Sequence, residues 1–395
     1  MIRKVCIFSS SASSIITQAK LFQSALVNEL PRSIDTELIV IPPIHPMPME
    51  TFKRIRDCEL GVFILDPFYR FNVLGLPKYA FFKLTVDGVQ MSSEINASMR
   101  LICERHECFA NTEFSKANLE ANNIKVRGIV RDGIKNIPTP PINPVSDFTM
   151  LGLYNHGGNP IMDRKGQNIA TALLVKLLHY YDFSVIVGSN VDYLHHVAGK
   201  YVELIQTRVR KASRFGVAID ELYYGFGNNL INYPHKLFSY TSVDSLMSGS
   251  INKPGFNFVL IGGLDEVQVR MLYSLSRFFL FPSLTEGFGV PPLEAMNSGR
   301  FVIVNSYQTA KELLPSDCAY FIKPSHVTEY LWGNKVAPML MKYVYPDMDD
   351  FTDIITKAVM NGINYDSFKC VQESLKYEYR KSYEPLVKKV METIK

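Results

Sequence analysis

The sequence predicts an α/β fold with two doubly wound domains, each built on a parallel sheet. At 395 residues the chain is too long for one ordinary hydrophobic core. Short apolar runs alternate with helical stretches in both halves, as in parallel sheets covered on both faces. A proline-rich segment separates the halves and indicates a stiff linker, so we place the domains at 1–140 and 145–374. Its prolines are Pro138, Pro140, Pro141 and Pro144.

The first half follows a strand, helix, strand order. Its strands are recognised as short apolar runs, of which Val5 to Phe8 is the first. Prolines between Ile41 and Pro48 indicate an extended loop, and the chain turns at Asp87-Gly88-Val89 after the last of these strands. The predicted strands cover 5–8, 36–41, 60–65 and 82–86, and the predicted helix covers 17–30.

The second half repeats this pattern from Phe148 onwards. The segment between Gly188 and Phe256 is long and irregular, and we interpret it as an insertion that contacts an acceptor or a second subunit. A homodimer is therefore one of the two interpretations of this insertion. The predicted strands cover 148–153, 184–187, 257–261 and 277–281, with 301–304 completing the parallel set, and the predicted helices cover 166–180 and 365–395.

Composition and charge exclude several classes of protein. With 47% hydrophobic and 20% charged residues, the chain has an ordinary globular composition. A net charge of +4 gives no general case for nucleic acid or an anionic membrane. The basic cluster between Arg208 and Arg214 is typical of a solvated helical face, with contact to an anionic acceptor or a membrane phosphate as the alternative.

The chain shows no targeting or membrane signal. It begins with a strand near Lys4 rather than a signal peptide. No run approaches the roughly 20 apolar residues that a membrane span needs. Six cysteines lie scattered without a Cys-x-x-Cys pair, which favours buried, reduced thiols in a soluble cytoplasmic protein. They are Cys6, Cys58, Cys103, Cys108, Cys318 and Cys370.

The most informative segment runs from Phe281 to Met296 and reads FPSLTEGFGVPPLEAM. The apolar run before it predicts a buried strand. Pro291 and Pro292 suit the first turn of a helix, where a missing N–H does no harm. A strand, a glycine turn and a helix N-terminus together present free amides and a positive dipole end to an anion, usually a phosphate.

Two glycines and two glutamates stand inside this segment. Gly287 and Gly289 allow a positive φ and close approach of the backbone to a ligand. The carboxylates of Glu286 and Glu294 accept hydrogen bonds well, so they suit the hydroxyls of a hexose or a ribose. A capped strand-to-helix turn of any doubly wound domain is the alternative interpretation.

The segment closely resembles the Glu-x7-Glu signature of retaining glycosyltransferases of the two-Rossmann-domain GT-B type, family 4, also called group 1. The resemblance implies that Glu286 contacts the transferred sugar and Glu294 contacts the ribose of the nucleotide. It also implies a cleft between the domains and a C-terminal helix, at about 375–395, that crosses back to the first domain. Backbone beside the sugar and diphosphate would come from Gly287, Phe288, Gly289 and Val290.

A pair of cations opens the helix predicted from 166. The macrodipole disfavours positive charge at a helix N-terminus, so Arg164 and Lys165 need a compensating anion, which a donor diphosphate would supply. Lys165 matches the lysine that binds the donor pyrophosphate in the family. Leu153 follows Gly152 where the family has an arginine, so either Arg164 substitutes for it or the pyrophosphate is bound more weakly. The alternative is a solvated pair with Asp163 as the helix cap.

Two positions depart from the family pattern. The first-domain loop carries serines and an alanine where relatives usually carry glycines, yet Ser11 and Ala12 still offer amides to the donor phosphate. A plain strand-to-helix turn is an equal alternative there. Asp87 stands where relatives commonly carry a histidine near the reacting sugar. Its carboxylate could bind a sugar hydroxyl or stabilise positive charge at the anomeric carbon, or it could form a turn.

The resemblance implies a retaining hexosyltransferase that moves a hexose from a nucleotide diphospho-sugar to a glycan, glycoprotein or other hydroxyl acceptor. The segment from Phe281 to Met296 is similar to the corresponding segment of mannosyltransferases, which favours GDP-mannose as donor, with UDP-hexose as the alternative. No metal or other cofactor is expected, because the adjacent His195-His196 pair is not a ligand spacing and no Asp-x-Asp follows a strand. Some virus-encoded, chlorovirus-like members of the family are also similar.

Two other functions share this architecture. A nucleotide-sugar epimerase would release the sugar into water, and turnover of the donor without an acceptor would favour it. A nucleotide-sugar-binding protein that has lost catalysis is suggested by the serine loop and by Asp87. Tight donor binding without transfer would favour this second alternative.

Overall fold

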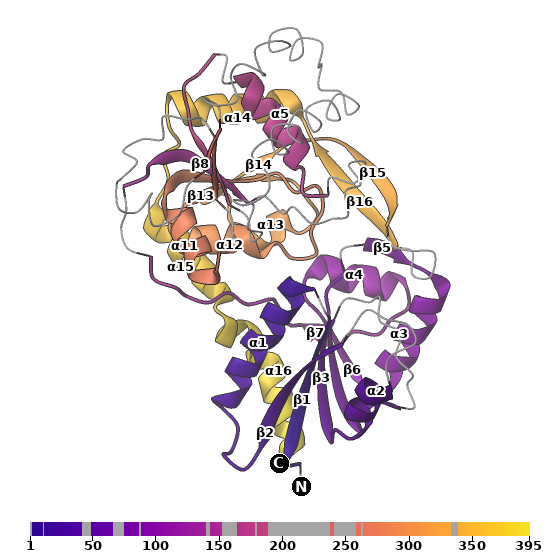
Figure 1. Cartoon of the computed structure of the whole chain (residues 1–395). Helices are drawn as coiled ribbons and strands as arrows, with labels where there is room; N and C mark the ends of the chain where they lie inside the picture. The colour runs from indigo at the N-terminus through magenta and orange to yellow at the C-terminus, as the bar shows by residue number, and fades with distance from the viewer. Residues whose placement is uncertain are drawn as a thin grey trace.

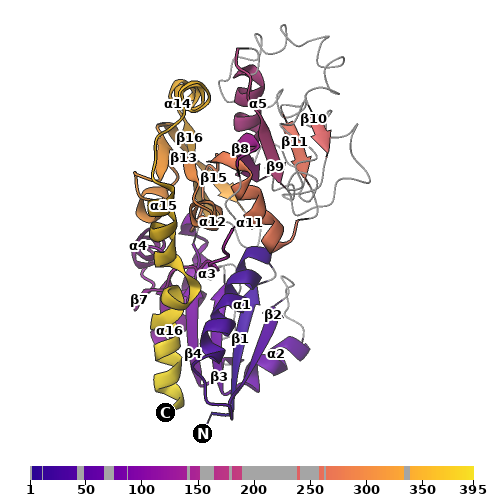
Figure 2. The same cartoon turned by 90° about the vertical axis from the view of Figure 1, so that its left-hand side faces the viewer.

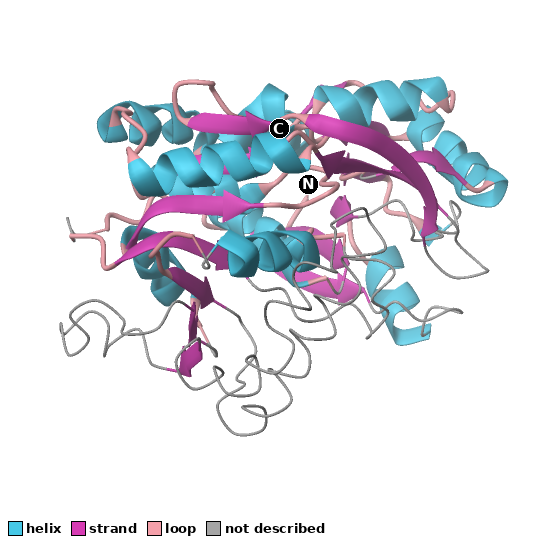
Figure 3. Cartoon of the chain, turned by 90° about the horizontal axis from the view of Figure 1, so that it is seen from above, coloured by secondary structure: helices cyan, strands magenta, loops and turns pink. Residues whose placement is uncertain are grey.

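The chain folds into two α/β domains, each with a parallel sheet between helices (Figure 1). This confirms the predicted fold class. Figure 3 distinguishes the helices and strands by colour. The computed structural model describes residues 2–10, 12–41, 49–65, 75–86, 88–139, 143–151, 164–177, 180–188, 238–240, 258–261, 264–332 and 339–395. The insertion predicted after Gly188 lies mostly outside these residues.

The first domain contains a six-stranded sheet in the order β2-β1-β3-β4-β6-β7. All its neighbouring strands are parallel. One face is packed against α2 and α3, and the other against α1 and the last helix of the chain. The elements are β1 Lys4–Ser10, α1 Ser13–Val27, β2 Asp35–Ile41, α2 Met49–Arg56, β3 Leu60–Leu65, β4 Tyr79–Leu84, α3 Ser93–Arg105, β6 Glu107–Ala110, α4 Glu113–Ala121 and β7 Gly128–Ile129.

The second domain contains a seven-stranded sheet in the order β10-β11-β9-β8-β12-β13-β14. The expectation that 301–304 completes the parallel set is wrong, because β14 pairs beyond β13 at the sheet edge. The β14 run Ala-Tyr-Phe-Ile is apolar but only four residues long. The elements are β8 Ser146–Leu151, α5 Gln167–Leu177, β9 Val185–Gly188, β10 Phe238–Tyr240, β11 Phe258–Ile261, α11 Glu266–Ser274, β12 Ser276–Phe281, α12 Val290–Asn297, β13 Phe301–Asn305, α13 Ala310–Leu313, β14 Ala319–Ile322, α14 Met348–Met360 and α15 Ser367–Ser374.

The last helix, α16 (Tyr379–Ile394), returns to the first domain and packs beside α1 (Figure 2). Its Tyr383 is fully buried against Phe22 and donates a hydrogen bond to Gln18, 2.7 Å away. A short 3-10 turn, η3 (Leu375–Tyr377), precedes it. At this crossing the Ile134 backbone bonds both to Tyr377 and to Tyr379.

A three-stranded antiparallel sheet joins the two domains. The hairpin β15 (Pro324–Trp332) and β16 (Met339–Pro346) leaves the second domain, and β16 pairs with β5 (Gly88–Met91) of the first (Figure 1). Sequence patterns did not predict this sheet. Cross-domain pairing has no local signature, since β16 and its partner β5 are about 250 residues apart in the chain.

Two disulfide bonds overturn the expectation of six reduced thiols. Cys6 pairs with Cys58 at a Cα separation of 6.2 Å, and Cys103 pairs with Cys108 at 5.4 Å. Both separations suit a disulfide. The first pair could not be predicted from sequence spacing, because 52 residues separate the two cysteines. They meet because β1 and β3 are neighbours in the sheet. Cys318 and Cys370 are free and buried.

Within the described ranges, no helix is both long and apolar enough to cross a membrane.

The disulfides can be checked by counting thiols. We expect an alkylating reagent to label two cysteines in the denatured, unreduced chain and six after reduction, measured by intact mass. Labels should map to Cys318 and Cys370 before reduction. Six labels without any reductant would contradict the disulfides and restore the expectation of a reduced protein.

Candidate functional site

The candidate site is built around the loop between β12 and α12. Gly289 caps the helix with a φ of 93°, a left-handed conformation that favours glycine. A Cβ atom at this position would lie 2.3 Å from the Tyr307 hydroxyl, so the close packing also requires glycine. Gly287 does not adopt a positive φ, which corrects the expectation for that residue. Pro291 and Pro292 lie in the first turn of α12, as predicted.

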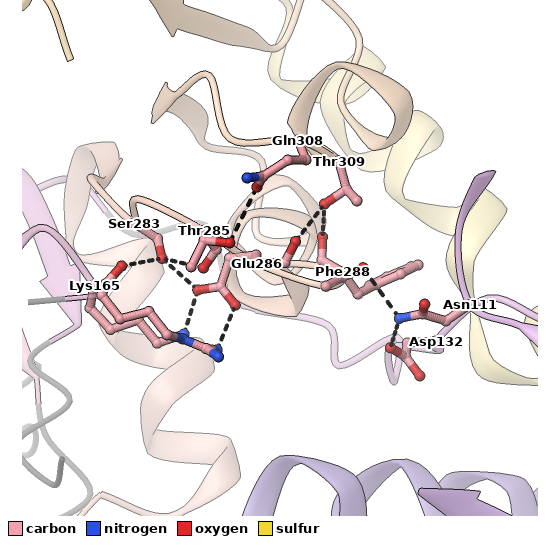
Figure 4. Close-up of polar contacts among 11 residues, drawn as sticks. Asn111, Asp132, Lys165, Ser283, Thr285, Glu286, Phe288, Gln308 and Thr309 are labelled. Carbon is pink, nitrogen blue, oxygen red and sulfur yellow. Dashed lines mark hydrogen bonds and ion pairs between the residues drawn. The ribbon is translucent and has the colours of Figure 1, made fainter. Parts of the chain in front are cut away.

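The Glu286 carboxylate is buried in this loop, with 7% of the residue exposed. It contacts the Lys165 ammonium closely, and Arg164 Nη2 lies 3.4 Å from it (Figure 4). The Ser283 hydroxyl donates a hydrogen bond to it at 2.7 Å. Burial alone would raise the pKa of the carboxyl, but the charges of Lys165 and Arg164 outweigh burial and lower that pKa below its ordinary value.

The two cations come from the turn before α5. Gly166 has a φ of 63°, and a Cβ there would lie 1.9 Å from the Pro282 carbonyl oxygen. This close approach brings the turn against the β12 loop, where Leu284 N bonds the Arg164 carbonyl at 2.8 Å. The side chains of Arg164 and Lys165 are only 17% and 14% exposed, so they are not a solvated pair. The predicted cap Asp163 lies outside the described residues.

Glu294 lies in a second polar cluster on α12. Its carboxylate is 3.0 Å from Arg270 Nη2 and accepts a hydrogen bond of 3.2 Å from the Tyr273 hydroxyl. Burial raises the pKa of Tyr273 well above its ordinary value, and the charge of Glu294 raises it further, so the hydroxyl keeps its proton and donates. Sequence reasoning missed both partners, although each lies on the face of α11 that packs against α12.

A third polar group reaches the loop from the first domain. Lys83 is fully buried and forms an ion pair with Asp132. Asn111 Nδ2 then lies 3.4 Å from Asp132 Oδ2 and 3.3 Å from the Gly287 carbonyl oxygen (Figure 4). A lysine inside the apolar strand β4 was the sequence signal for this buried pair.

Strand β16 supports the loop from the other side. Val344 N donates to the Leu284 carbonyl at 2.9 Å. Asn305 Nδ2 bonds the Val344 carbonyl at 2.6 Å and the Ser283 carbonyl at 3.1 Å. The strand that pairs with the first domain is therefore also hydrogen-bonded to the backbone beside Glu286.

The domains also meet where Glu312, just inside α13, faces the start of α4. Its carboxylate accepts hydrogen bonds of 3.0 and 3.1 Å from the Glu113 amide. Arg131 lies 3.7 Å from the same carboxylate. A carboxylate is favourable there because it meets free amides and the positive end of the α4 dipole.

Other predicted site residues have varied surroundings. Asp87 and Ser11 lie outside the described residues, and Ala12 is exposed at the start of α1. Phe288 is buried and its carbonyl accepts a hydrogen bond from the Thr309 hydroxyl at 3.2 Å. Val290, partly buried, begins α12. Across the part of the chain that the structure describes, no three His, Cys, Asp or Glu residues are grouped to hold a metal ion.

Comparisons of the whole chain define the fold as GT-B. The Anabaena protein HepE, solved in complex with UDP and glucose, is 10% identical and superposes with a TM-score of 0.61, covering 99% of this chain and 100% of that chain. Sucrose-phosphate synthase from Thermosynechococcus elongatus is 11% identical with a TM-score of 0.60, covering 99% and 98%. At such identities the likeness shows the fold alone.

Sequence similarity is confined to part of the second domain or to short stretches. A family model described as glycosyl transferases group 1 matches residues 253–333, which include the β12 loop. The serotype-specific mannosyltransferase WbdA of Escherichia coli is 38% identical over 63 residues, or 16% of this chain and 8% of the relative. The O-antigen chain mannosyltransferase RfbU of Salmonella typhimurium is 40% identical over 53 residues, or 13% and 15%. Each match thus spans less than a fifth of the relative.

The close packing at Gly289 gives a stability prediction. Gly289→Ala should lower the free energy of unfolding by about 2 kcal/mol or more, because the left-handed φ strains alanine and the new methyl meets Tyr307. Gly128→Ala is the control, since nothing lies within 4 Å of a Cβ there. Urea unfolding should show a change of at most about 0.5 kcal/mol for the control. Equal losses for both variants would contradict the close packing.

The buried ion cluster gives a second prediction. Lys165→Met should cost about 3 kcal/mol at pH 7, because it removes a main counter-charge of the buried Glu286 carboxylate. The double variant with Glu286→Gln should lose less than the single variant. The control is Lys376→Met at an exposed ion pair, where urea unfolding should detect at most about 0.5 kcal/mol.

The pH dependence of the same variants has a definite sign. The folded-state pKa of Glu286 is lowered, so its ion cluster stabilises the protein above the ordinary glutamate pKa of 4.5 and less as the pH falls through the lowered value. The stability difference between wild type and Lys165→Met should therefore shrink in acid. A difference that grows below pH 4.5 would contradict the assignment.

Proposed function

We propose that this protein is a retaining glycosyltransferase that moves a hexose from a nucleotide diphospho-sugar to a hydroxyl acceptor. The observation that carries the proposal is the cluster of Arg164 and Lys165 around the buried carboxylate of Glu286, at a helix start in a GT-B fold. The group 1 glycosyl transferase match over 253–333 supports it, as do the named mannosyltransferases with similar segments.

A donor diphosphate would replace the Glu286 carboxylate as the partner of Arg164 and Lys165. Arg164 and Lys165 precede α5, whose first turn offers free amides to an anion. A diphosphate carries more negative charge than one carboxylate and competes for both cations. Binding would then leave the Glu286 carboxylate to accept hydrogen bonds from hydroxyls of the sugar. The two cations and the amides would also stabilise the charge of the leaving diphosphate, so the proposed reaction is metal-independent.

Glu286 would act on the sugar as an acceptor of hydrogen bonds and as a fixed negative charge. Its lowered pKa keeps it ionised, so it can stabilise positive charge that develops at the anomeric carbon. Retention of configuration by front-face attack within an ion pair is part of the proposal. The resemblance of the Glu286 to Glu294 segment to retaining enzymes supports it.

We propose one preferred donor, one alternative donor and one class of acceptor. GDP-mannose is preferred because both named sequence relatives are mannosyltransferases. UDP-hexose is the alternative, since the Anabaena structure contains UDP and glucose. The acceptor would be a hydroxyl of a glycan or glycoprotein. Glu294, held by Arg270 and Tyr273, would bind the ribose of the donor.

Two substitutions separate donor binding from transfer. Lys165→Ala should weaken binding of the preferred nucleoside diphosphate at least tenfold, about 1.4 kcal/mol, because a charge-assisted contact is lost. Glu286→Gln should keep that binding and lower sugar transfer by about a hundredfold or more. Calorimetric titration with GDP, GDP-mannose, UDP and UDP-glucose, followed by a transfer assay over a glycoside panel, measures both.

The control is Lys369→Ala at an exposed ion pair on α15, which should change neither property. Undiminished transfer by Glu286→Gln would refute the role of that carboxylate. Tight donor binding without any transfer would favour a binding protein, and donor turnover without an acceptor would favour an epimerase.

A further inference from the structure

Two polar side chains at the edge of the first sheet each have an oxygen atom without a hydrogen-bond partner. Thr85 follows β4 and Asn111 follows β6, directly after the register pair Leu84 and Ala110 of these neighbouring parallel strands. Thr85 and Asn111 are therefore adjacent at the carboxyl ends of the strands, the edge where ligands bind in open α/β sheets. The contact between Asn111 and Gly287 places this edge against the candidate site.

The unpartnered atoms are Thr85 Oγ1 and Asn111 Oδ1, and both are buried. A buried polar atom that makes no hydrogen bond is unfavourable, and such atoms often mark a site that a ligand completes. Asn111 as a whole has no exposed surface. Both oxygens therefore have unused hydrogen-bonding capacity.

The orientation of Asn111 decides which chemistry fits. Its Nδ2 lies near two oxygens that only accept hydrogen bonds, Asp132 Oδ2 at 3.4 Å and the Gly287 carbonyl at 3.3 Å. Flipping the amide would place its oxygen against both. Asp132 is itself fixed by the ion pair with buried Lys83. Asn111 Oδ1 therefore requires a donor from the ligand.

A hydroxyl group meets this requirement and an anion does not. A phosphate or carboxylate oxygen has no proton to donate to Asn111 Oδ1, and it would lie near the Asp132 carboxylate. A hydroxyl can donate to Asn111 and also exchange a hydrogen bond with the Thr85 hydroxyl, which both donates and accepts. Adjacent ring hydroxyls of a sugar fit the pair.

We propose that Thr85 and Asn111 form a recognition site for sugar hydroxyls, on either the transferred hexose or the acceptor. The proposal rests on the glycosyltransferase function proposed above and extends it to two residues of the first domain. It also explains why the Asn111 amide is held by a buried ion pair: the pair fixes the direction of Oδ1.

The test uses Thr85→Val, which replaces the unpartnered hydroxyl by a methyl of similar size. The Tm of this variant should equal or exceed that of wild type, because no hydrogen bond is lost in the free protein. The matched control is Thr149→Val in the second domain. Its hydroxyl is bonded to Ser276 and to the Leu272 carbonyl, so the control should lose Tm and keep ligand binding.

Binding and kinetics then separate the two sources of hydroxyls. If the pair binds the transferred hexose, Thr85→Val weakens binding of the nucleotide sugar that wild type prefers, GDP-mannose or UDP-glucose, about tenfold. Binding of the matching nucleoside diphosphate then stays unchanged. If the pair binds the acceptor, both affinities stay unchanged, while KM for methyl α-mannoside rises about tenfold.

The proposal is overturned if Thr85→Val changes none of these quantities, or if it weakens nucleotide and nucleotide sugar equally. Asn111→Leu provides a second variant with the same expected pattern of binding. If wild type binds no nucleotide sugar, the glycosyltransferase proposal fails. The hydroxyl site is then tested alone by the Tm shift that methyl α-mannoside produces in wild type and that Thr85→Val should abolish. A missing shift in wild type would overturn the site as well.

Discussion

The buried charge of Glu286 is the constraint on which the site depends. A carboxylate with so little exposed surface is stable only beside opposite charge, and Arg164 and Lys165 provide it. These cations can reach it only because Gly166 lets the turn before α5 approach the backbone of Pro282 closely. One electrostatic requirement thus fixes the relative position of two loops that are more than 100 residues apart in the chain.

The first domain meets this loop pair through backbone groups and buried polar side chains. Asn111 contacts the Gly287 carbonyl, and the Glu312 carboxylate accepts hydrogen bonds from the start of α4. Strand β16 pairs with β5 on one edge and bonds to Leu284 beside the site. The geometry of the candidate site therefore depends on both domains, although its charged residues come mostly from the second.

The sequence predicted local features well because they have local causes. The β12 strand, the α12 start and the cation pair at 164–165 follow from apolar runs, prolines and charges that are neighbours in the chain. Partners that meet only in space were missed: Arg270 with Glu294, Lys83 with Asp132, and Cys6 with Cys58. Sequence spacing carries no signal for such pairs. Gly287 was assigned a positive φ because one sequence pattern cannot distinguish which of two nearby glycines makes the turn.

The return of α16 to the first domain affects the order in which the chain can fold during synthesis. Tyr383, Leu386 and Val390 complete the apolar layer over α1, yet the ribosome makes them after the entire second domain. Until then, Phe22 and its neighbours lack their cover. The first domain must therefore wait for the second to be synthesised, and a nascent chain that pauses before 379 exposes an apolar surface that chaperones bind.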